Sequence, residues 1–271
     1  MSLAVRPLCP LCPLCDHLAP VNVLAIPTRV FRPPRDDLQE LLATSLPALE
    51  EEDVVAISSK IVSIGEGRCV PEGAVADKDA LIRREAGRYL EREEVPGGYV
   101  MHTLTRGVLA PSAGIDASNA GGHFILWPGD PPRSARRIWR QLRARHGLRR
   151  LGVIITDSRS APLRRGVLGF ALAHWGFRPL RDYRGRRDVF GRRLRFSQAN
   201  VADALGAAAV LAMGEGAEQT PLALIRGAPG LRFVARPGRS TERFSGLEVP
   251  PEEDLYWPFL RGVPWCPGGQ T

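Results

Sequence analysis

The stretch Leu151-Gly-Val-Ile-Ile-Thr156 is a continuous apolar run, and Asp157-Ser-Arg159 follows it directly. An apolar run of this length, without polar alternation, predicts a strand that is buried in the interior of a sheet. Asp53-Val-Val-Ala-Ile-Ser58 has the same character. These two runs predict the centre of a β-sheet, and each is followed by polar residues.

Strands and helices alternate outward from these two runs. Asp36 and Asp37 can cap a helix that carries leucines at helical spacing as far as Leu46, just before Pro47. Further helices are expected across 79–93, 134–145 and 201–213, and further strands at 21–26, 99–104, 108–110, 124–127, 222–225 and 231–234. The alternation predicts an α/β (α+β mixed) fold, with a mixed sheet and helices on its faces.

Positive charge is concentrated in the middle of the chain. The whole sequence has a net charge of +8, and Lys60 and Lys78 are its only lysines. Residues 133–195 hold 19 arginines and three acidic residues, a net charge of +16, so the rest is acidic overall. Such a segment indicates a surface facing an anion, which could be nucleic acid or an acidic small molecule, or arginine bias on solvated helices. Isolated aromatic residues and the lack of a recognisable reading module argue against nucleic acid.

The cysteines and the hydropathy exclude several classes of protein. An apolar content of 44% is too high for a disordered chain, and no apolar run reaches the ~18–20 residues of a membrane-spanning helix. Cys9, Cys12 and Cys15, followed by His17, stand in a Pro-rich segment. They allow a zinc or iron–sulfur site, but their tight spacing and the prolines favour a plain extended tail. The odd number of cysteines and the lack of a secretory signal predict a cytoplasmic protein.

Four polar segments stand at the ends of the predicted elements, where binding sites are usually built. Ser58–Gly67 combines hydroxyls, Lys60 and glycines, so it could contact a phosphate or form an ordinary structural turn. Ser112–Asn119 and Thr156–Arg159 each carry an aspartate. Met213–Pro221 is an acidic, glycine-rich turn, in which the glycines allow close approach of a ligand.

The acidic residues of these segments suit a metal ion bound together with phosphate. Asp116 and Asp157 could share Mg²⁺, which prefers a few carboxylates plus phosphate oxygens, and Glu215 and Glu218 add possible ligands. The alternative for each aspartate is a helix cap or an Asx turn. No Cys–His or Gly-x-Ser-x-Gly arrangement for a nucleophile occurs in the sequence.

Seven motifs follow one another along the chain. They are Ser59-Lys-Ile-Val-Ser63 with Glu66-Gly-Arg68, Ala113-Gly-Ile-Asp-Ala-Ser-Asn119, Ile155-Thr-Asp-Ser158, Arg181-Asp-Tyr-Arg-Gly185, Asp188-Val-Phe-Gly-Arg192, Asn200-Val-Ala-Asp203 and Met213-Gly-Glu-Gly216. In this order they resemble the coenzyme F420-0:L-glutamate ligase (γ-glutamyl ligase) superfamily. The chain is most similar to a branch described as folate-metabolism γ-glutamate ligases, through residues 156–164, 214–222 and 254–259.

The resemblance implies a mixed-sheet γ-glutamyl ligase fold with a catalytic domain at 21–260, a Pro/Cys-rich tail at 1–20 and a C-terminal tail at 261–271. It implies an intertwined homodimer. It also implies a ligase that joins L-glutamate to a carboxylate-bearing acceptor, F420-0-like or folate-like, through an acyl phosphate. The implied co-substrate is GTP or ATP, and the implied metal is Mg²⁺ or Mn²⁺.

The resemblance also implies roles for individual residues, with Asp116 and Asp157 as the catalytic pair. The implied metal ligands are Asp116, Asp157, Ser158 and Glu215. The implied nucleotide contacts are Ser59, Lys60, Asn119, Met213, Gly214, Glu215 and Gly216.

One position departs from the family pattern. F420 ligases carry a GTP-contacting lysine after Ile-Val-Ser, where this chain has Ile64. The departure bears on nucleotide and acceptor preference rather than on the fold or the metal ligands. From their chemistry alone, Arg159 and Arg181 are candidates for holding substrate carboxylates. Two alternatives stay open, namely a homologue that binds nucleotide and metal without turnover and a basic nucleic-acid-binding protein.

Overall fold

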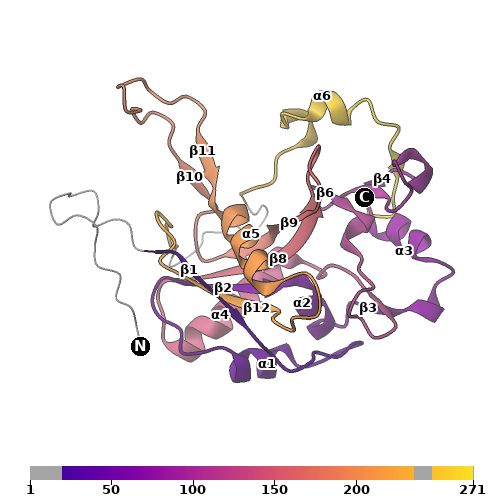
Figure 1. The fold of residues 1–271 in the computed structure, drawn as a ribbon, viewed down its shortest axis with the longest axis horizontal. Coiled ribbons are helices and arrows are strands. Elements are labelled where there is room, and N and C mark those ends of the chain that lie inside the picture. The colour runs from indigo at the N-terminus through magenta and orange to yellow at the C-terminus, as the bar shows by residue number, and fades with distance from the viewer. Residues whose placement is uncertain (1–19, 235–245, 271) are drawn as a thin grey trace.

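A computed structural model describes residues 20–234 and 246–270, so the Cys9–Cys15 segment lies outside the described residues. The centre is a five-stranded sheet in the order β1-β12-β2-β8-β9 (Figure 1). β2 and β8 run parallel and every other neighbouring pair is antiparallel, which confirms the predicted mixed sheet. The strands are β1 (Asn22–Ile26), β2 (Asp53–Ser58), β8 (Leu151–Ser160), β9 (Val167–Trp175) and β12 (Leu222–Arg226).

Helices cover both faces of this sheet, as the alternating direction of strand side chains requires. Val54 and Ile154 point to the face covered by α5. Val55 and Ile155 point to the opposite face, which the other three helices cover. The helices are α1 (Leu38–Ser45), α2 (Ser59–Gly65), α4 (Pro131–His146) and α5 (Val201–Met213). This three-layer arrangement confirms the predicted fold class.

Local sequence signals account for the ends of the two long helices. The Asp130 carboxylate accepts a hydrogen bond from the Arg133 N–H and caps α4, which ends at Gly147 in a left-handed conformation (φ 67°). Asn200 caps α5 in the same way. α5 lies very close to the sheet, because a Cβ on Gly206 would stand 2.7 Å from the Phe170 carbonyl carbon. Within the described ranges, no helix has the length and apolar character needed to cross a membrane.

A second, smaller sheet has the order β13-β4-β5-β6, and β13 pairs with β4, so the segment expected as a C-terminal tail takes part in this sheet. Leu81, Ile82 and Met101 form part of its core. Its strands are β4 (Arg88–Tyr89), β5 (His102–Thr105), β6 (Val108–Pro111) and β13 (Cys266–Pro267), and the pair β3 (Cys69–Pro71) and β7 (His123–Ile125) is separate. The remaining helices are α3 (Lys78–Glu85), α6 (Trp257–Leu260) and the 3₁₀ turns η2 (Glu72–Ala74), η3 (Arg92–Glu94), η4 (Ser112–Gly114) and η6 (Pro251–Glu253).

Residues 180–200 form an arm that extends away from the body (Figure 1). Its base is the antiparallel pair β10 (Leu180–Asp182) and β11 (Gln198–Asn200). Val189, Phe190 and Phe196 are 93%, 94% and 88% exposed. An arm with large apolar side chains in solvent has the character of an assembly surface.

Two predictions of local structure were wrong, and one long strand was not predicted. The helix expected across 79–93 ends at Glu85, because Gly87 donates its N–H to the Leu104 carbonyl and the chain continues into β4. The strand expected across 231–234 is reduced to one bridge between Phe177 and Phe233. β9, which the sequence analysis missed, pairs with β8 along its whole length.

Candidate active site

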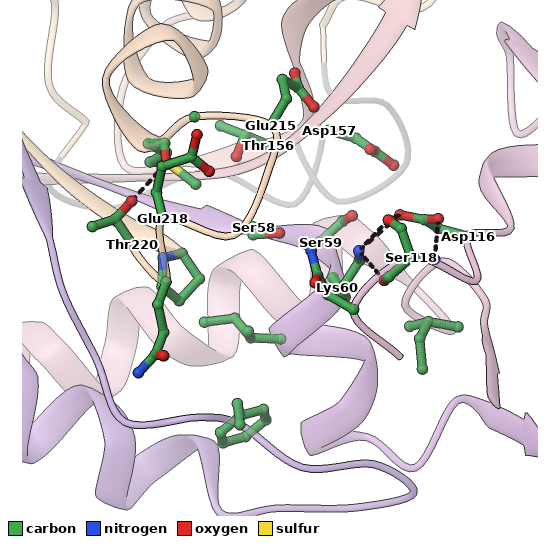
Figure 2. Close-up of a pocket in the computed structure, with 18 of the residues that line it drawn as sticks. Ser58, Ser59, Lys60, Asp116, Ser118, Thr156, Asp157, Glu215, Glu218 and Thr220 are labelled. Carbon is green, nitrogen blue, oxygen red and sulfur yellow. Dashed lines mark hydrogen bonds and ion pairs between the residues drawn. The ribbon is translucent and has the colours of Figure 1, made fainter. Parts of the chain in front are cut away.

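A cavity of about 370 Å³ opens at the end of β2, beside α2 and the turn that follows α5 (Figure 2). Because β2 and β8 are parallel, their carboxyl ends meet at one edge of the sheet, and ligands of α/β proteins bind at such an edge. The cavity is lined by all ten residues that the sequence predicted for the site: Ser59, Lys60, Asp116, Asn119, Asp157, Ser158, Met213, Gly214, Glu215 and Gly216. The structure therefore brings together segments that lie more than 150 residues apart in sequence.

Asp157 lies on β8 just after a bulge between Ile155 and Thr156. Its carboxylate accepts hydrogen bonds from the indole N–H of Trp127 and from the Ser158 N–H (2.8 Å). Burial raises the pKa of Asp157 to about 6, although hydrogen bonds from Trp127, Ser158 and Ser59 to the carboxylate act in the opposite direction. In the metal-free protein this aspartate therefore takes up a proton at mildly acidic pH.

Asp116 has the opposite electrostatic character. Its backbone forms two hydrogen bonds with Ile125, N–O 3.0 and 2.8 Å, which fix the loop. The carboxylate contacts Lys60 Nζ at 2.7 Å and accepts the N–H and the hydroxyl of Ser118, both at 2.8 Å (Figure 2). Burial acts to raise the pKa of Asp116, but the hydrogen bonds from Lys60 and Ser118 outweigh it, and the pKa lies below its usual value. Asp116 is therefore ionised at neutral pH.

Glu215 completes the set of carboxylates from the turn after α5. Its carboxylate accepts the Ser158 hydroxyl at 3.3 Å, and burial raises its pKa. Asn119 donates its amide to the Gly216 carbonyl at 2.9 Å and so ties the loop of Asp116 to this turn. Gly214 has a φ of 81°, and a Cβ there would stand 2.4 Å from the Glu218 carboxyl carbon, so the turn requires glycine.

The oxygen atoms of this site suit a hard divalent cation. The carboxylates of Asp116, Asp157 and Glu215 and the hydroxyl of Ser158 line one cavity, and Mg²⁺ prefers oxygen ligands. Among residues 20–234 and 246–270, no three His, Cys, Asp or Glu side chains stand close enough to form a complete metal cage. Mg²⁺ usually binds through one or two carboxylates together with phosphate oxygens and water. The residues therefore fit a metal ion that binds together with a phosphate-bearing ligand.

The two arginines suggested for substrate carboxylates lie outside this cavity. Arg159 stacks on Phe170, with its guanidinium carbon 4.7 Å from the ring centroid, and pairs with Asp203 at 3.5 Å. Arg181 stands at the base of the arm and lines a different cavity. Among the described residues, Lys60 is the cationic side chain that pairs with a predicted metal ligand, Asp116.

Trp127 is a site residue that the sequence does not indicate, because it stands at the end of a predicted strand. The Trp127 ring packs directly on Gly114, where a Cβ would stand 2.0 Å from a ring atom, and its N–H bonds to Asp157. Trp127 is 30 residues away from Asp157 in sequence, so no local pattern connects them. Ser118, whose two donors orient Asp116, lies within a sequence motif that does not by itself indicate this role.

Ile64, the position that departs from the family pattern, is 2% exposed and lines the cavity. It belongs to the same apolar cluster as Ile61 and Val62 of α2. The wall of the cavity is therefore apolar where the resemblance implies a lysine.

Comparisons with known proteins agree with this geometry. The family model described as F420-0:Gamma-glutamyl ligase matches residues 26–227. The coenzyme F420:L-glutamate ligase of Methanopyrus kandleri is 38% identical over 211 residues, which are 72% of this chain and 82% of that protein. The protein of the same name from Methanothermobacter thermautotrophicus is 34% identical over 237 residues, 78% of this chain and 93% of that protein. The one from Methanocaldococcus jannaschii is 28% identical over 256 residues, 87% and 96% of the two chains.

Proposed function

Since this chain belongs to the F420-0:gamma-glutamyl ligase family and is a γ-glutamyl ligase that forms amide bonds, we propose that its 370 Å³ cavity joins L-glutamate to an acceptor carboxylate at the expense of a nucleoside triphosphate. One observation carries the proposal. Asp116, Asp157 and Glu215 reach a single cavity from three separate segments, and Lys60 stands beside them.

The proposed reaction has two steps. An acceptor carboxylate oxygen attacks the terminal phosphorus of the triphosphate, and the bond to the nucleoside diphosphate breaks. The amine of glutamate then attacks the carbonyl carbon of the acyl phosphate, and inorganic phosphate and a proton leave. Positioning and charge stabilisation supply most of the catalysis in phosphoryl transfer.

The side chains of the cavity suit this chemistry. Asp116, Asp157, Ser158 and Glu215 would hold Mg²⁺ or Mn²⁺, which when bound neutralises charge on the triphosphate oxygens. Lys60 keeps Asp116 ionised and places an ammonium group on the cavity wall. Trp127 and Ser158 hold the Asp157 carboxylate in one orientation. Asn119 fixes the turn at Gly216, and Gly214 in the same turn, with its positive φ, lets the chain pass close to the Glu218 carboxylate.

The acceptor is proposed to be F420-0 or a folate-like molecule that carries a free carboxylate. F420-0 is the acceptor in the description of the family model, and the motifs at 214–222 and 254–259 favour the folate-like molecule. Ile64 removes one cation from the nucleotide pocket, so the choice between GTP and ATP depends on other contacts, and both are candidates.

The proposed assembly is a homodimer in which the arm of one protomer packs on the other. Support comes from Phe190 and Phe196 on the arm, because large apolar side chains that are exposed together mark interaction surfaces. Replacing both by serine should shift the mass in light scattering towards a monomer. The matched change Leu211→Ser, on an 86% exposed side chain of α5, should leave the mass unchanged, and equal effects of the two changes would contradict the assignment.

The ligase proposal is tested with labelled L-glutamate, MgCl₂ and either ATP or GTP. F420-0 and folate monoglutamate are supplied as separate acceptors, with phosphate release and product mass as readouts. We expect phosphate release only when metal, glutamate and the right acceptor are all present. Asp157→Asn should abolish it without unfolding the chain, whereas Glu72→Gln, an exposed acid on η2, should not change it.

Three results would contradict the proposal in different ways. Full activity in Asp157→Asn would remove that residue from the site. Nucleotide and metal binding without turnover on either acceptor would favour the non-catalytic homologue. A steep, salt-dependent affinity for random RNA or DNA, without ligation, would favour a nucleic-acid-binding protein.

A further inference from the structure

A second cavity, of about 300 Å³, lies at the base of the arm, on the far side of α5 from the turn that carries Glu215. Four arginines line it, which are Arg178, Arg181, Arg186 and Arg232. They come from two segments, the start of the arm and the loop at 230–232. The motif at Arg181–Gly185 thus contributes to a site that the proposed phosphoryl transfer does not use.

The four positive charges of this cavity outnumber the one carboxylate among its lining residues, that of Asp182, whose pKa Arg184 and Arg186 hold low. Among the described residues, none of the four guanidinium groups forms an ion pair. Asp182, the acid on the cavity wall, is held by Arg184 through Nη2–Oδ2 (2.6 Å) and Nε–Oδ1 (3.0 Å) contacts. Four like charges around one cavity repel one another, so a ligand with several negative charges would be stabilised there.

The backbone and two ring contacts hold the arginines in place. The Arg178 N–H donates to the Arg232 carbonyl at 2.9 Å, which joins the two segments. The guanidinium groups of Arg181 and Arg186 lie 5.0 and 5.4 Å from the centroid of the Tyr183 ring. Gly230 approaches Arg181 so closely that a Cβ would stand 2.4 Å from its Nη1 atom. The backbone bond therefore joins the two segments, and the ring contacts place Arg181 and Arg186 beside Tyr183.

Apolar side chains in the lining of the cavity narrow the class of ligand. Leu180, Val201 and Leu231 line it together with the arginines. Guanidinium groups bind carboxylates and phosphates alike, but the apolar part of the lining suits a ligand that also has methylene groups. An oligo-γ-glutamyl chain alternates α-carboxylates with pairs of methylenes, whereas inorganic polyphosphate has none.

The two cavities are separated by the length of α5. Val201 lines the arginine cavity, and Val210 and Met213 line the first cavity. At a rise of 1.5 Å per residue, these positions lie about 14 to 18 Å apart along the helix. A single glutamate does not span this distance, but a chain of γ-linked glutamates, which gains one carboxylate with each addition, has the required length and charge.

We infer that the cavity at the base of the arm binds the carboxylates of an oligo-γ-glutamyl chain, either free or attached to the acceptor. The inference rests on the proposed γ-glutamyl transfer for the identity of the ligand. In this inference the base of the arm holds the γ-glutamyl tail of the acceptor, while the next glutamate is added to the carboxylate at the end of that tail.

The test is calorimetric titration of the full-length protein with tetra-γ-glutamate, without nucleotide or metal. Arg178→Gln with Arg232→Gln removes two cavity charges whose guanidinium groups form no hydrogen bond, ion pair or ring contact within the described ranges, and it should weaken binding about tenfold or more. Arg133→Gln with Arg140→Gln removes the same charge from the exposed face of α4, and it should change the affinity by less than about twofold. The single change Arg181→Gln, with circular dichroism to confirm folding, provides an independent variant.

Tripolyphosphate and a folate tetraglutamate, titrated at the same ionic strength, distinguish the sources of the anion. If the folate conjugate binds more tightly than the free peptide, the ligand of the cavity is the tail of the acceptor. If the two bind equally, the ligand is the γ-glutamyl chain alone. The inference is overturned if the wild type binds no tetra-γ-glutamate, if both double variants lose affinity equally, or if tripolyphosphate binds more tightly. Because these titrations need no turnover, an active ligase that does not bind the peptide refutes only the arginine site, and a binding protein that does not ligate refutes only the proposed function.

Discussion

Trp127→Phe is the change that tests most directly how the structure tunes the metal site. The indole N–H of Trp127 donates to the Asp157 carboxylate, and phenylalanine keeps an aromatic ring against Gly114 but has no donor. A hydrogen bond to the charged form lowers the pKa of an acid, so removing the donor raises it. The pKa of Asp157, about 6 with the indole in place, should therefore rise.

The size of the rise follows from the strength of the lost bond. A hydrogen bond to a charged group contributes about 1.5–3 kcal/mol, which corresponds to about one to two pKa units. The pKa of Asp157 would then lie at about 7 to 8. Since a metal ion binds the ionised carboxylate, Mg²⁺ affinity at pH 7 should fall about two- to tenfold from competition with protons alone.

Two measurements check this reasoning. The carboxyl carbon shift of Asp157, followed by NMR in the metal-free protein, gives the pKa directly. Titration with MgCl₂ in the presence of a non-hydrolysable triphosphate at pH 7.0 and 8.5 gives the metal affinity. Trp139→Phe is the matched control, because its indole N–H donates to the neutral Leu151 carbonyl at 2.8 Å in the core, so this variant should lose stability but keep the wild-type affinity.

The pH dependence distinguishes the proposed cause from a simple loss of packing. At pH 8.5 most of the Asp157 carboxylate is ionised even in Trp127→Phe. The Mg²⁺ affinities of the variant and the wild type should therefore be nearly equal at this pH. An equal loss of affinity at both pH values, or an unchanged pKa in the variant, would refute the reasoning.

Three other changes test the site and the fold. Burial raises the pKa of Asp157 in the folded protein above its value in the unfolded chain. Between about pH 4 and 6 the folded protein therefore holds a proton that the unfolded chain has lost, and its stability falls as the pH rises through this window. Asp157→Asn should therefore make the metal-free protein more stable at pH 7, by about 1–2 kcal/mol, but not at pH 4, in urea unfolding. Lys60→Met removes the 2.7 Å contact to Asp116 and should weaken triphosphate binding about tenfold in calorimetry with little change in unfolding midpoint. Gly206→Ala forces a Cβ to 2.7 Å from the Phe170 carbonyl carbon and should destabilise the protein by about 1–3 kcal/mol, despite alanine's higher helix propensity, as a lower midpoint in thermal unfolding would show.

Much of this protein can be predicted from its sequence, because the decisive signals are local. Asp53–Ser58 and Val201–Met213 have the predicted bounds, since a continuous apolar run and a capped, alanine-rich segment each determine their own structure. All ten site residues that the resemblance implies line one cavity, because α2 begins where β2 ends, Asp157 and Ser158 lie near the end of the parallel strand β8, and the turn after α5 and the loop of Asp116 reach the same place. The family also follows from the motifs and their order.

Contacts between distant segments could not be predicted in this way. The hydrogen bond from Trp127 to Asp157 depends on how β7 and β8 are placed, and neither residue's neighbours in sequence indicate it. In the sequence, the basic segment at 133–195 is one continuous feature. The fold divides it between the exposed side of α4, the sheet and the arm, and Arg181 is thereby separated from the first cavity. Local patterns specify each strand and helix, but only the packing of the layers decides which side chains meet, because that depends on every segment at once.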